Sequence, residues 1–334
     1  MFIRLLKKLV IGLAAVLVSA VLIGATYQWL ASRADRQKHP APGRIFEVDG
    51  LALHLDCRGD GSPIVVLEAG LTSGGTSWAL VHDSLAQQTR VCAYDRPGLD
   101  WSEPMGRSAG ATEVADRLHE LLSTAGIDGP QILVGMSAGG VYVREYFHRY
   151  PRDIVGMVLV DSSHEQQGLR LPKMTGSENM TAMLTLCVWL QPIGVIRALG
   201  FLDALLDQYD LSQNVRELLS ANMNQSHACS VIRDETGGFQ ADVNNPDPPR
   251  PLGDLPLTVL SQGKPPAANE QLGTTLEFAT RTAVVWNQLQ EELTALSSRS
   301  VRRIAQKSGH VIQFEQPDLV VSAITGQVAQ YRAR

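Results

Sequence analysis

One stretch decides the fold of this chain: Ile132-Leu133-Val134-Gly135-Met136-Ser137-Ala138-Gly139-Gly140. An apolar run rich in β-forming residues stops at a Gly-x-Ser-x-Gly pattern, and a helix-compatible segment, 141–147, follows directly. A strand that turns tightly into a helix strains the backbone of the residue at the turn, and glycines remove the Cβ atoms that would clash there. The pattern therefore predicts a strand, a turn that exposes the hydroxyl group of Ser137, and a helix N-terminus that favours negative charge. A glycine-rich turn without chemistry is the alternative.

Strands and helices alternate on both sides of this turn. Strands are predicted over 44–48, 51–57, 64–67, 91–94, 132–134, 155–160, 257–260 and 301–305, and helices over 78–88, 112–124, 141–150, 276–296 and from 317 onward. Asp49-Gly50 predicts a hairpin between the first two strands. Repeated β-α units predict an α/β fold, with a mostly parallel sheet and helices on both faces. Ligands bind at the carboxyl ends of such strands, where Ser137, Asp161 and His310 all fall.

The N-terminus has the composition of a membrane span. Leu9 to Leu30 carries no charged residue and is long enough to cross about 30 Å of hydrocarbon. Basic residues precede this run, so the positive-inside rule predicts a cytoplasmic N-terminus and a single-pass protein of the inner or plasma membrane, with its body on the periplasmic side. A cleaved signal peptide is the alternative, although its apolar region is usually only about 7–15 residues long.

Changes in composition along the chain predict its domain organisation. Residues 1–8 are expected in the cytoplasm, 9–30 in the membrane, and 31–43 in a polar linker with two prolines. The α/β core is predicted over 44–161 and 253–334, interrupted by a helical insert over 162–252 that ends in the Pro-rich segment 244–251. A formal net charge of -5 argues against a nucleic-acid partner. No metal-ligand spacing or phosphate loop is present, so we predict no metal and no cofactor.

Five stretches in this order resemble the α/β-hydrolase superfamily, and more narrowly its lid-bearing bacterial members with an N-terminal membrane segment. The stretches are Val65-Val66-Leu67-Glu68-Ala69-Gly70, Tyr94-Asp95-Arg96-Pro97-Gly98-Leu99-Asp100-Trp101-Ser102, Val134-Gly135-Met136-Ser137-Ala138-Gly139-Gly140, Val158-Leu159-Val160-Asp161 and Ser308-Gly309-His310. The resemblance implies an eight-stranded sheet, a lid formed by the insert, and a triad in the order serine, acid, histidine.

Each member of the triad has a candidate in this chain. Ser137 is the nucleophile, and because a serine hydroxyl is a weak acid it needs a base. His310 follows the last strand and suits proton exchange near neutral pH. The acid must accept the Nδ1–H of His310. The resemblance allows two positions for it: Asp161, which we favour, and the loop after residue 260, where Glu270 is the first carboxylate and stands in reserve.

The oxyanion hole is expected to consist of backbone N–H groups. The residue after the nucleophile, Ala138, supplies one, and the resemblance places the other at Leu71. The chain departs from the superfamily pattern at Met136, where His is frequent, and at Asp100, where Gly is usual. Glu68 precedes the loop of Gly70 and Leu71, here called the oxyanion loop, and we expect it to pair with Arg96 or another base.

The fold that the resemblance implies suggests two cysteine pairs. The strands of Cys57 and Cys92 are antiparallel neighbours in it, and Cys187 and Cys229 both lie in the insert, so both pairs are predicted as disulfides in an oxidising compartment. Four buried free thiols are the alternative. Several apolar residues at the start of the insert are expected to line the substrate entrance: Met174, Met180, Met183, Leu184, Leu186, Val188 and Trp189.

These features predict a membrane-anchored serine hydrolase, a carboxylesterase or lipase-like enzyme that cleaves a small-molecule ester with an apolar part through an acyl-enzyme. An acyltransferase or an amide or peptide hydrolase would use the same triad. A membrane-tethered binding protein without activity is the alternative from another class. Epoxide and haloalkane hydrolysis are disfavoured, because members with those activities carry Asp where this chain has Ser137.

Overall fold

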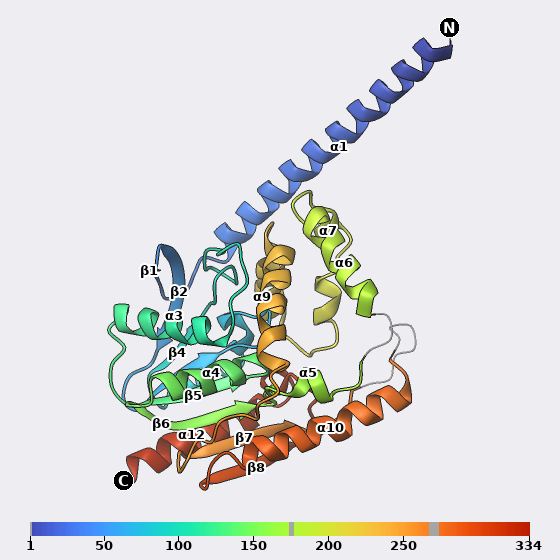
Figure 1. The fold of residues 1–334 in the computed structure, drawn as a ribbon. Coiled ribbons are helices and arrows are strands. Elements are labelled where there is room, and N and C mark those ends of the chain that lie inside the picture. The colour runs from blue at the N-terminus through green and yellow to red at the C-terminus, as the bar shows by residue number, and fades with distance from the viewer. Residues whose placement is uncertain (1, 174–176, 267–273) are drawn as a thin grey trace.

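Eight strands form one sheet in the computed structural model, which describes residues 2–173, 177–266 and 274–334 (Figure 1). The strands are β1 (Arg44–Val48), β2 (Leu51–Arg58), β3 (Ile64–Glu68), β4 (Val91–Tyr94), β5 (Gln131–Met136), β6 (Ile154–Val160), β7 (Leu257–Gln262) and β8 (Ser300–Ala305). Their order across the sheet is β1-β2-β4-β3-β5-β6-β7-β8. β2 is antiparallel to both of its neighbours, and all other pairs are parallel. The predicted eight-stranded, mostly parallel sheet is confirmed.

Helices cover both faces of the sheet because its central strands are apolar on both sides. All residues of β3 and β5 are buried. On one face α3 (Ala111–Thr124) and α4 (Ala138–Arg149) contribute to one hydrophobic cluster, and on the other α2 (His82–Ala86) and α12 (Pro317–Arg332) contribute to a second. The remaining helices of the core are η1 (Gly75–Trp78), α10 (Leu276–Thr294) and α11 (Ile312–Glu315). This three-layer arrangement brings the carboxyl ends of the parallel strands to one edge.

The hairpin predicted at Asp49-Gly50 connects β1 and β2. Both residues have positive φ, 48° and 75°, as a two-residue type I′ turn requires. The turn sets the register, which pairs Val48 with Leu51. This antiparallel pair forms one edge of the sheet.

The insert forms a helical layer over the carboxyl ends of the strands (Figure 1). Its elements are α5 (Gln167–Arg170), α6 (Ser177–Leu190), α7 (Val195–Ala198), η2 (Asp203–Leu206), α8 (Gln213–Met223) and α9 (Ala228–Val243). Arg144 of α4 donates to Glu165 and to the carbonyl oxygen of Ser163, so the start of the insert is fixed to the core. The insert therefore has the position of a lid.

Both predicted cysteine pairs are disulfides. Cys57 of β2 lies directly opposite Cys92 of β4 in the antiparallel register, and the two are bonded. Cys187 of α6 is bonded to Cys229 of α9, which places two insert helices against each other. One disulfide therefore fixes the edge of the sheet, and the other fixes the lid.

Replacing Cys57 and Cys92 together by Ala is expected to lower the free energy of unfolding by about 4 kcal/mol, the chain-entropy value for a cross-link of this span. The two residues are 35 positions apart. Urea titration of the variant and the parent measures the loss. A thiol count on unfolded protein checks the pairing, since it should find no free thiol without reductant and four with it. Free thiols in the unreduced protein would contradict it.

The N-terminal helix α1 (Phe2–Lys38) projects from the body of the protein (Figure 1). It is long and apolar enough to cross a membrane, judged by length and composition. It continues past the predicted span, so residues 31–38 of the expected linker are helical and only 39–43 connect it to β1. Both linker prolines, Pro40 and Pro42, lie beyond its end, and the segment before them consists mostly of helix-forming residues.

Charged residues of the expected linker contact the lid. Asp35 accepts a hydrogen bond from Arg197 at 2.7 Å, and Lys38 pairs with Glu217 at 2.6 Å. Gln28 is 1% exposed and donates to the carbonyl oxygen of Asn224 at 2.7 Å. The C-terminal part of α1 is therefore packed against α7 and α8.

Candidate active site

Ser137 lies at the turn between β5 and α4 with φ 51° and ψ −121°. The flanking glycines are required by close contacts. A Cβ on Gly135 would lie 2.5 Å from the carbonyl oxygen of Gly139, and a Cβ on Gly139 would lie 2.5 Å from that of Glu68. Any side chain at either position would force the turn open, which explains locally why this stretch folds as it does.

The structure brings Ser137, His310 and Asp161 into one hydrogen-bonded chain. His310 Nε2 is 2.9 Å from Ser137 Oγ, and His310 Nδ1 is 2.6 Å from Asp161 Oδ2. An ionised carboxylate can only accept a hydrogen bond, so Nδ1 carries the proton and Nε2 accepts from the serine hydroxyl. The reserve acid, Glu270, lies outside the described residues.

Asp161 is held by donors that the sequence did not reveal. It is fully buried at the end of β6, with φ 40°. Its Oδ1 accepts from the indole N–H of Trp286 at 3.0 Å and from the backbone N–H of Gln262 at 2.8 Å. The Trp286 ring also contacts the His310 imidazole edge to face, with centroids 5.6 Å apart. In the sequence, Trp286 is an ordinary apolar residue of a long helix, so no local signal identifies this role.

The two expected oxyanion donors lie on elements that meet at Ser137. Ala138 begins α4. The loop of Leu71 packs on the nucleophile, since a Cβ on Gly70 would lie 2.6 Å from Met136 Sδ and 3.4 Å from Ser137 Cβ. Within the described ranges, the backbone N–H groups of Leu71 and Ala138 have no hydrogen-bond partner. Both are therefore free to bind a substrate oxygen.

A buried ion cluster supports this loop. The predicted pair of Glu68 and Arg96 is confirmed at 2.6 Å. Arg96 also donates to the carbonyl oxygens of Ala69 and Gly70 at 2.9 and 2.7 Å. Glu235 of α9, which was not predicted, accepts from Arg96 at 2.7 Å. The arginine thus joins the oxyanion loop to the lid.

Glu235 also contacts the loop directly. Its Oε2 accepts from the backbone N–H of Thr72 at 2.6 Å, and Thr72 has the positive φ of 60° that is rare for a β-branched residue. The residue after Leu71 is therefore held in an uncommon conformation by a lid side chain. The lid contributes to the site as well as covering it.

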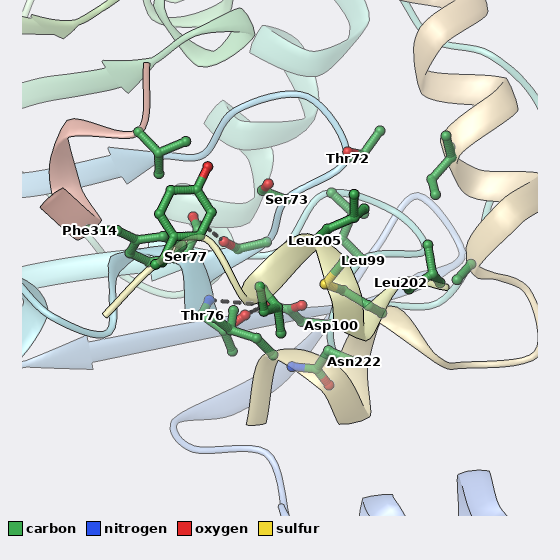
Figure 2. Close-up of a pocket in the computed structure, with 18 of the residues that line it drawn as sticks. Thr72, Ser73, Thr76, Ser77, Leu99, Asp100, Leu202, Leu205, Asn222 and Phe314 are labelled. Carbon is green, nitrogen blue, oxygen red and sulfur yellow. Dashed lines mark hydrogen bonds between the residues drawn. The ribbon is translucent and has the colours of Figure 1, made fainter. Parts of the chain in front are cut away.

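A cavity of about 350 Å³ adjoins the site. Figure 2 shows residues that line it. Its lining includes Met136, Thr72 and Val311, which are the sequence neighbours of Ser137, Leu71 and His310. The lid supplies most of its apolar wall: Leu202, Leu205, Leu206, Tyr209, Leu219, Met223, Val231 and Ile232. Such a cavity accepts a ligand with an apolar part.

The sequence placed this apolar wall on the wrong lid helix. Among the residues expected to form it, Met183, Leu186 and Trp189 are exposed on the outside of α6, Trp189 at 74%. Leu184 and Val188 do not line the cavity either, and Met174 and the side chain of Met180 lie outside the described residues. The Cys187–Cys229 disulfide turns one side of α6 toward α9 and leaves the opposite side exposed.

Asp100 places a carboxyl group in the cavity wall. Burial, together with the nearby Asp95 carboxylate, raises the pKa of Asp100 to about 7, although hydrogen bonds from Thr76 oppose this. The charge of His54 also lowers the pKa of Asp100, and Arg36 donates to the backbone carbonyl oxygen of Asp100. The pKa of Asp100 therefore lies well above the value of about 3.9 that an aspartate has in an unfolded chain.

Asp100→Asn is expected to gain stability relative to the wild type as the pH rises from 5 to 8. Between about pH 4 and 7 Asp100 is ionised in the unfolded chain but still holds its proton in the folded wild type. The free energy of unfolding of the wild type therefore falls as the pH rises through this range. Asn cannot ionise and so avoids this loss. Melting temperatures at both pH values measure the effect, and Asp210→Asn, at an exposed position, should keep the wild-type pH dependence. Equal differences between wild type and Asp100→Asn at both pH values would contradict it.

Acidic, histidine and cysteine side chains are the usual protein ligands of metal ions. Among residues 2–173, 177–266 and 274–334, no three or more of them lie close enough together to hold a metal ion.

Comparison with known sequences identifies relatives for most of the chain. The sequence profile of the alpha/beta hydrolase family matches residues 64–323. An uncharacterized protein of Schizosaccharomyces pombe is 27% identical over 307 residues, which make up 81% of this chain and 52% of that protein. An AB hydrolase superfamily protein of Gibberella zeae is 26% identical over 285 residues, or 78% of this chain and 85% of that one. The chain thus spans about half the length of the first of these relatives.

Solved structures show the same fold. The structure of a membrane phospholipase A, described as a novel bacterial virulence factor, has a TM-score of 0.65 at 18% identity and matches over 99% of both chains. Esterases, an enol-lactonase and an epoxide hydrolase also share the fold. Similarity at this level establishes the architecture, and the reaction must be argued from the site.

Proposed function

The chain belongs to the alpha/beta hydrolase family, and we propose that it is a serine hydrolase that cleaves carboxylic esters through an acyl-enzyme. One observation carries the proposal: Ser137, His310 and Asp161 form a continuous hydrogen-bonded chain, with distances of 2.9 and 2.6 Å. Nucleophile, base and orienting acid stand in the order of proton transfer that ester cleavage needs.

The proposed reaction begins when the Ser137 hydroxyl attacks the ester carbonyl and His310 Nε2 takes its proton. The tetrahedral oxyanion is stabilised by the N–H groups of Leu71 and Ala138. His310 then protonates the leaving alcohol, which leaves an acyl group on Ser137. A water molecule deprotonated by His310 hydrolyses this ester, and the acid is released. Asp161 stabilises the imidazolium in both halves of the reaction.

The cavity supports a substrate with an apolar part. Leucine and methionine side chains make up much of its lid wall, and about 350 Å³ accommodates a medium-sized acyl or alcohol group. Ser137 at the elbow supports ester over epoxide chemistry, because the proposed intermediate is an acylated serine. Transfer of the acyl group to an acceptor other than water would use the same residues, and product analysis with added alcohols separates the two.

The helix α1 supports attachment to a membrane. It presents an apolar, exposed surface from Phe2 to Ile23. Basic residues at its start favour a cytoplasmic N-terminus and a catalytic body on the other side. Two disulfides agree with this placement, since they persist in oxidising compartments. We therefore propose a single-pass anchor in the inner or plasma membrane with a periplasmic catalytic body.

Covalent labelling tests the proposed function. The full chain in detergent should react with a fluorophosphonate probe at Ser137, as mapped by mass spectrometry. Ser137→Ala and His310→Ala should abolish labelling, whereas Ser322→Ala, on α12, should not change it. If the folded wild type neither reacts with the probe nor hydrolyses any ester, the non-catalytic binding protein becomes the better explanation.

A further inference from the structure

We propose that one end of the cavity is a subsite for a hydroxyl group of the substrate, formed by Asp100 and Asn222 and organised by Arg36. The inference rests on the proposed function, because it defines the esters that the site prefers. Its three residues come from three elements: the loop after β4, lid helix α8 and the C-terminal end of α1. Figure 2 shows Asp100 and Asn222 among the lining residues.

Above its pKa of about 7, Asp100 supplies a hydrogen-bond acceptor. Its Oδ2 accepts from the backbone N–H and the hydroxyl group of Thr76, at 3.0 and 2.6 Å. Its Oδ1 accepts from no residue in the described part of the chain. The carboxyl group is therefore fixed by one oxygen and has the other available in a wall that is otherwise mostly apolar.

Asn222 supplies a hydrogen-bond donor. The residue lines the same cavity and is 9% exposed. Its Oδ1 accepts from Arg36 Nη1 at 3.5 Å, but its buried Nδ2 has no partner among the described residues. Buried amide groups in proteins nearly always have a partner. An unpaired amide N–H in a cavity wall indicates that a ligand or a water molecule is its hydrogen-bond partner.

Arg36 determines which end of the Asn222 amide is available. It donates both to the Asn222 side-chain oxygen and to the backbone carbonyl of Asp100, so it links the two residues. A flipped amide would place two donors against each other. The free groups are therefore one acceptor, Asp100 Oδ1, and one donor, Asn222 Nδ2.

A hydroxyl group matches this combination because it donates one hydrogen bond and accepts another. A substrate carboxylate would be repelled by the ionised Asp100, and an ammonium group has no acceptor for the Asn222 Nδ2–H. The leucine and methionine residues of the remaining wall would surround a hydrocarbon part. The substrate class is thus an ester with an apolar chain and a free hydroxyl group, carried on either the acyl or the alcohol part.

Matched ester pairs test the subsite in the full-length enzyme in detergent, at pH 8, where Asp100 is ionised. One pair differs by a hydroxyl group on the acyl chain, and the other by a hydroxyl group on the alcohol part. We expect the wild type to prefer the hydroxylated member of one pair by at least about tenfold in kcat/KM, as a well-placed buried hydrogen bond allows. The pair that shows the preference identifies which part of the substrate carries the group. Equal rates within both pairs would overturn the proposal.

Two variants connect the preference to these residues. Asp100→Asn keeps an oxygen for Thr76 but replaces the free acceptor by a donor, and Asn222→Leu removes the donor. Each should bring the ratio close to one, mainly through a lower kcat/KM on the hydroxylated ester. Asn214→Leu, on the exposed start of the same helix, should keep the wild-type ratio. Variants that lower both rates equally would argue for a purely structural role.

Binding measurements separate this inference from the proposed function. Non-hydrolysable ether analogues, with and without the hydroxyl group, are titrated into Ser137→Ala protein by calorimetry. Tighter binding of the hydroxylated analogue, lost in Asn222→Leu, supports the subsite even if no ester is cleaved. Equal affinities overturn the subsite even if fluorophosphonate labels Ser137.

Discussion

Asp161→Asn is expected to lower kcat/KM for a simple ester by about 10⁴-fold without unfolding the protein. The carboxylate accepts the Nδ1 proton of His310 at 2.6 Å and stabilises the imidazolium that forms when Ser137 attacks. An amide in its place can donate to Nδ1, which selects the imidazole tautomer that cannot accept the serine proton. Steady-state kinetics at several pH values measure the loss, and circular dichroism checks the fold.

A matched control decides between the two acids that the sequence allowed. Glu270→Gln removes the reserve carboxylate and should change kcat/KM by less than about twofold. Trp286→Phe removes one of the donors that hold Asp161, so a smaller loss is expected, of the order of a single hydrogen bond to a charged group, or about tenfold to a hundredfold. If Glu270→Gln caused the large loss and Asp161→Asn did not, the acid would be Glu270.

The sequence was sufficient to predict the sheet and three side chains that meet at its carboxyl edge, because both follow from local patterns. Apolar runs identify buried strands, and Ser137, Asp161 and His310 each come directly after one. The carboxyl ends of parallel strands lie at one edge of the sheet, so residues that follow different strands come close together there. The eight-stranded sheet was predicted from the resemblance, since periodicity alone does not give the number or order of strands in a sheet.

Other parts of the site depend on contacts between distant segments and had no local signal. Trp286 reaches Asp161, Glu235 reaches the oxyanion loop, and Arg36 reaches Asp100, across 125, 163 and 64 positions of sequence. The lid wall was misassigned for a related reason. An apolar helix such as α6 has two sides, and only the Cys187–Cys229 disulfide and the packing around it decide which one is buried.

Arg96 lies in a buried cluster of charged groups, so replacing it is expected to destabilise the protein strongly. Arg96→Met is expected to lower the free energy of unfolding by about 3–5 kcal/mol, because it leaves Glu68 in the interior without its counter-charge. The Glu68 side chain is 0% exposed and that of Arg96 is 3% exposed. Urea titration measures the loss. Arg149→Met is the matched control, since its pair with Asp116 is largely exposed and should contribute less than about 1 kcal/mol.

A second substitution separates the charge of Arg96 from its hydrogen bonds. Glu68→Gln combined with Arg96→Met removes the uncompensated charge. The carbonyl oxygens of Ala69 and Gly70 still lack the donors that Arg96 supplied. The double variant should therefore recover part of the stability while its kcat/KM stays low, because the loop that carries Leu71 has lost its support. A double variant that is as unstable as Arg96→Met would show that these hydrogen bonds, and not the buried charge, dominate. Recovery of both stability and activity would show that the oxyanion loop keeps its shape without Arg96, and that the lid residue Glu235 is sufficient to hold it through Thr72.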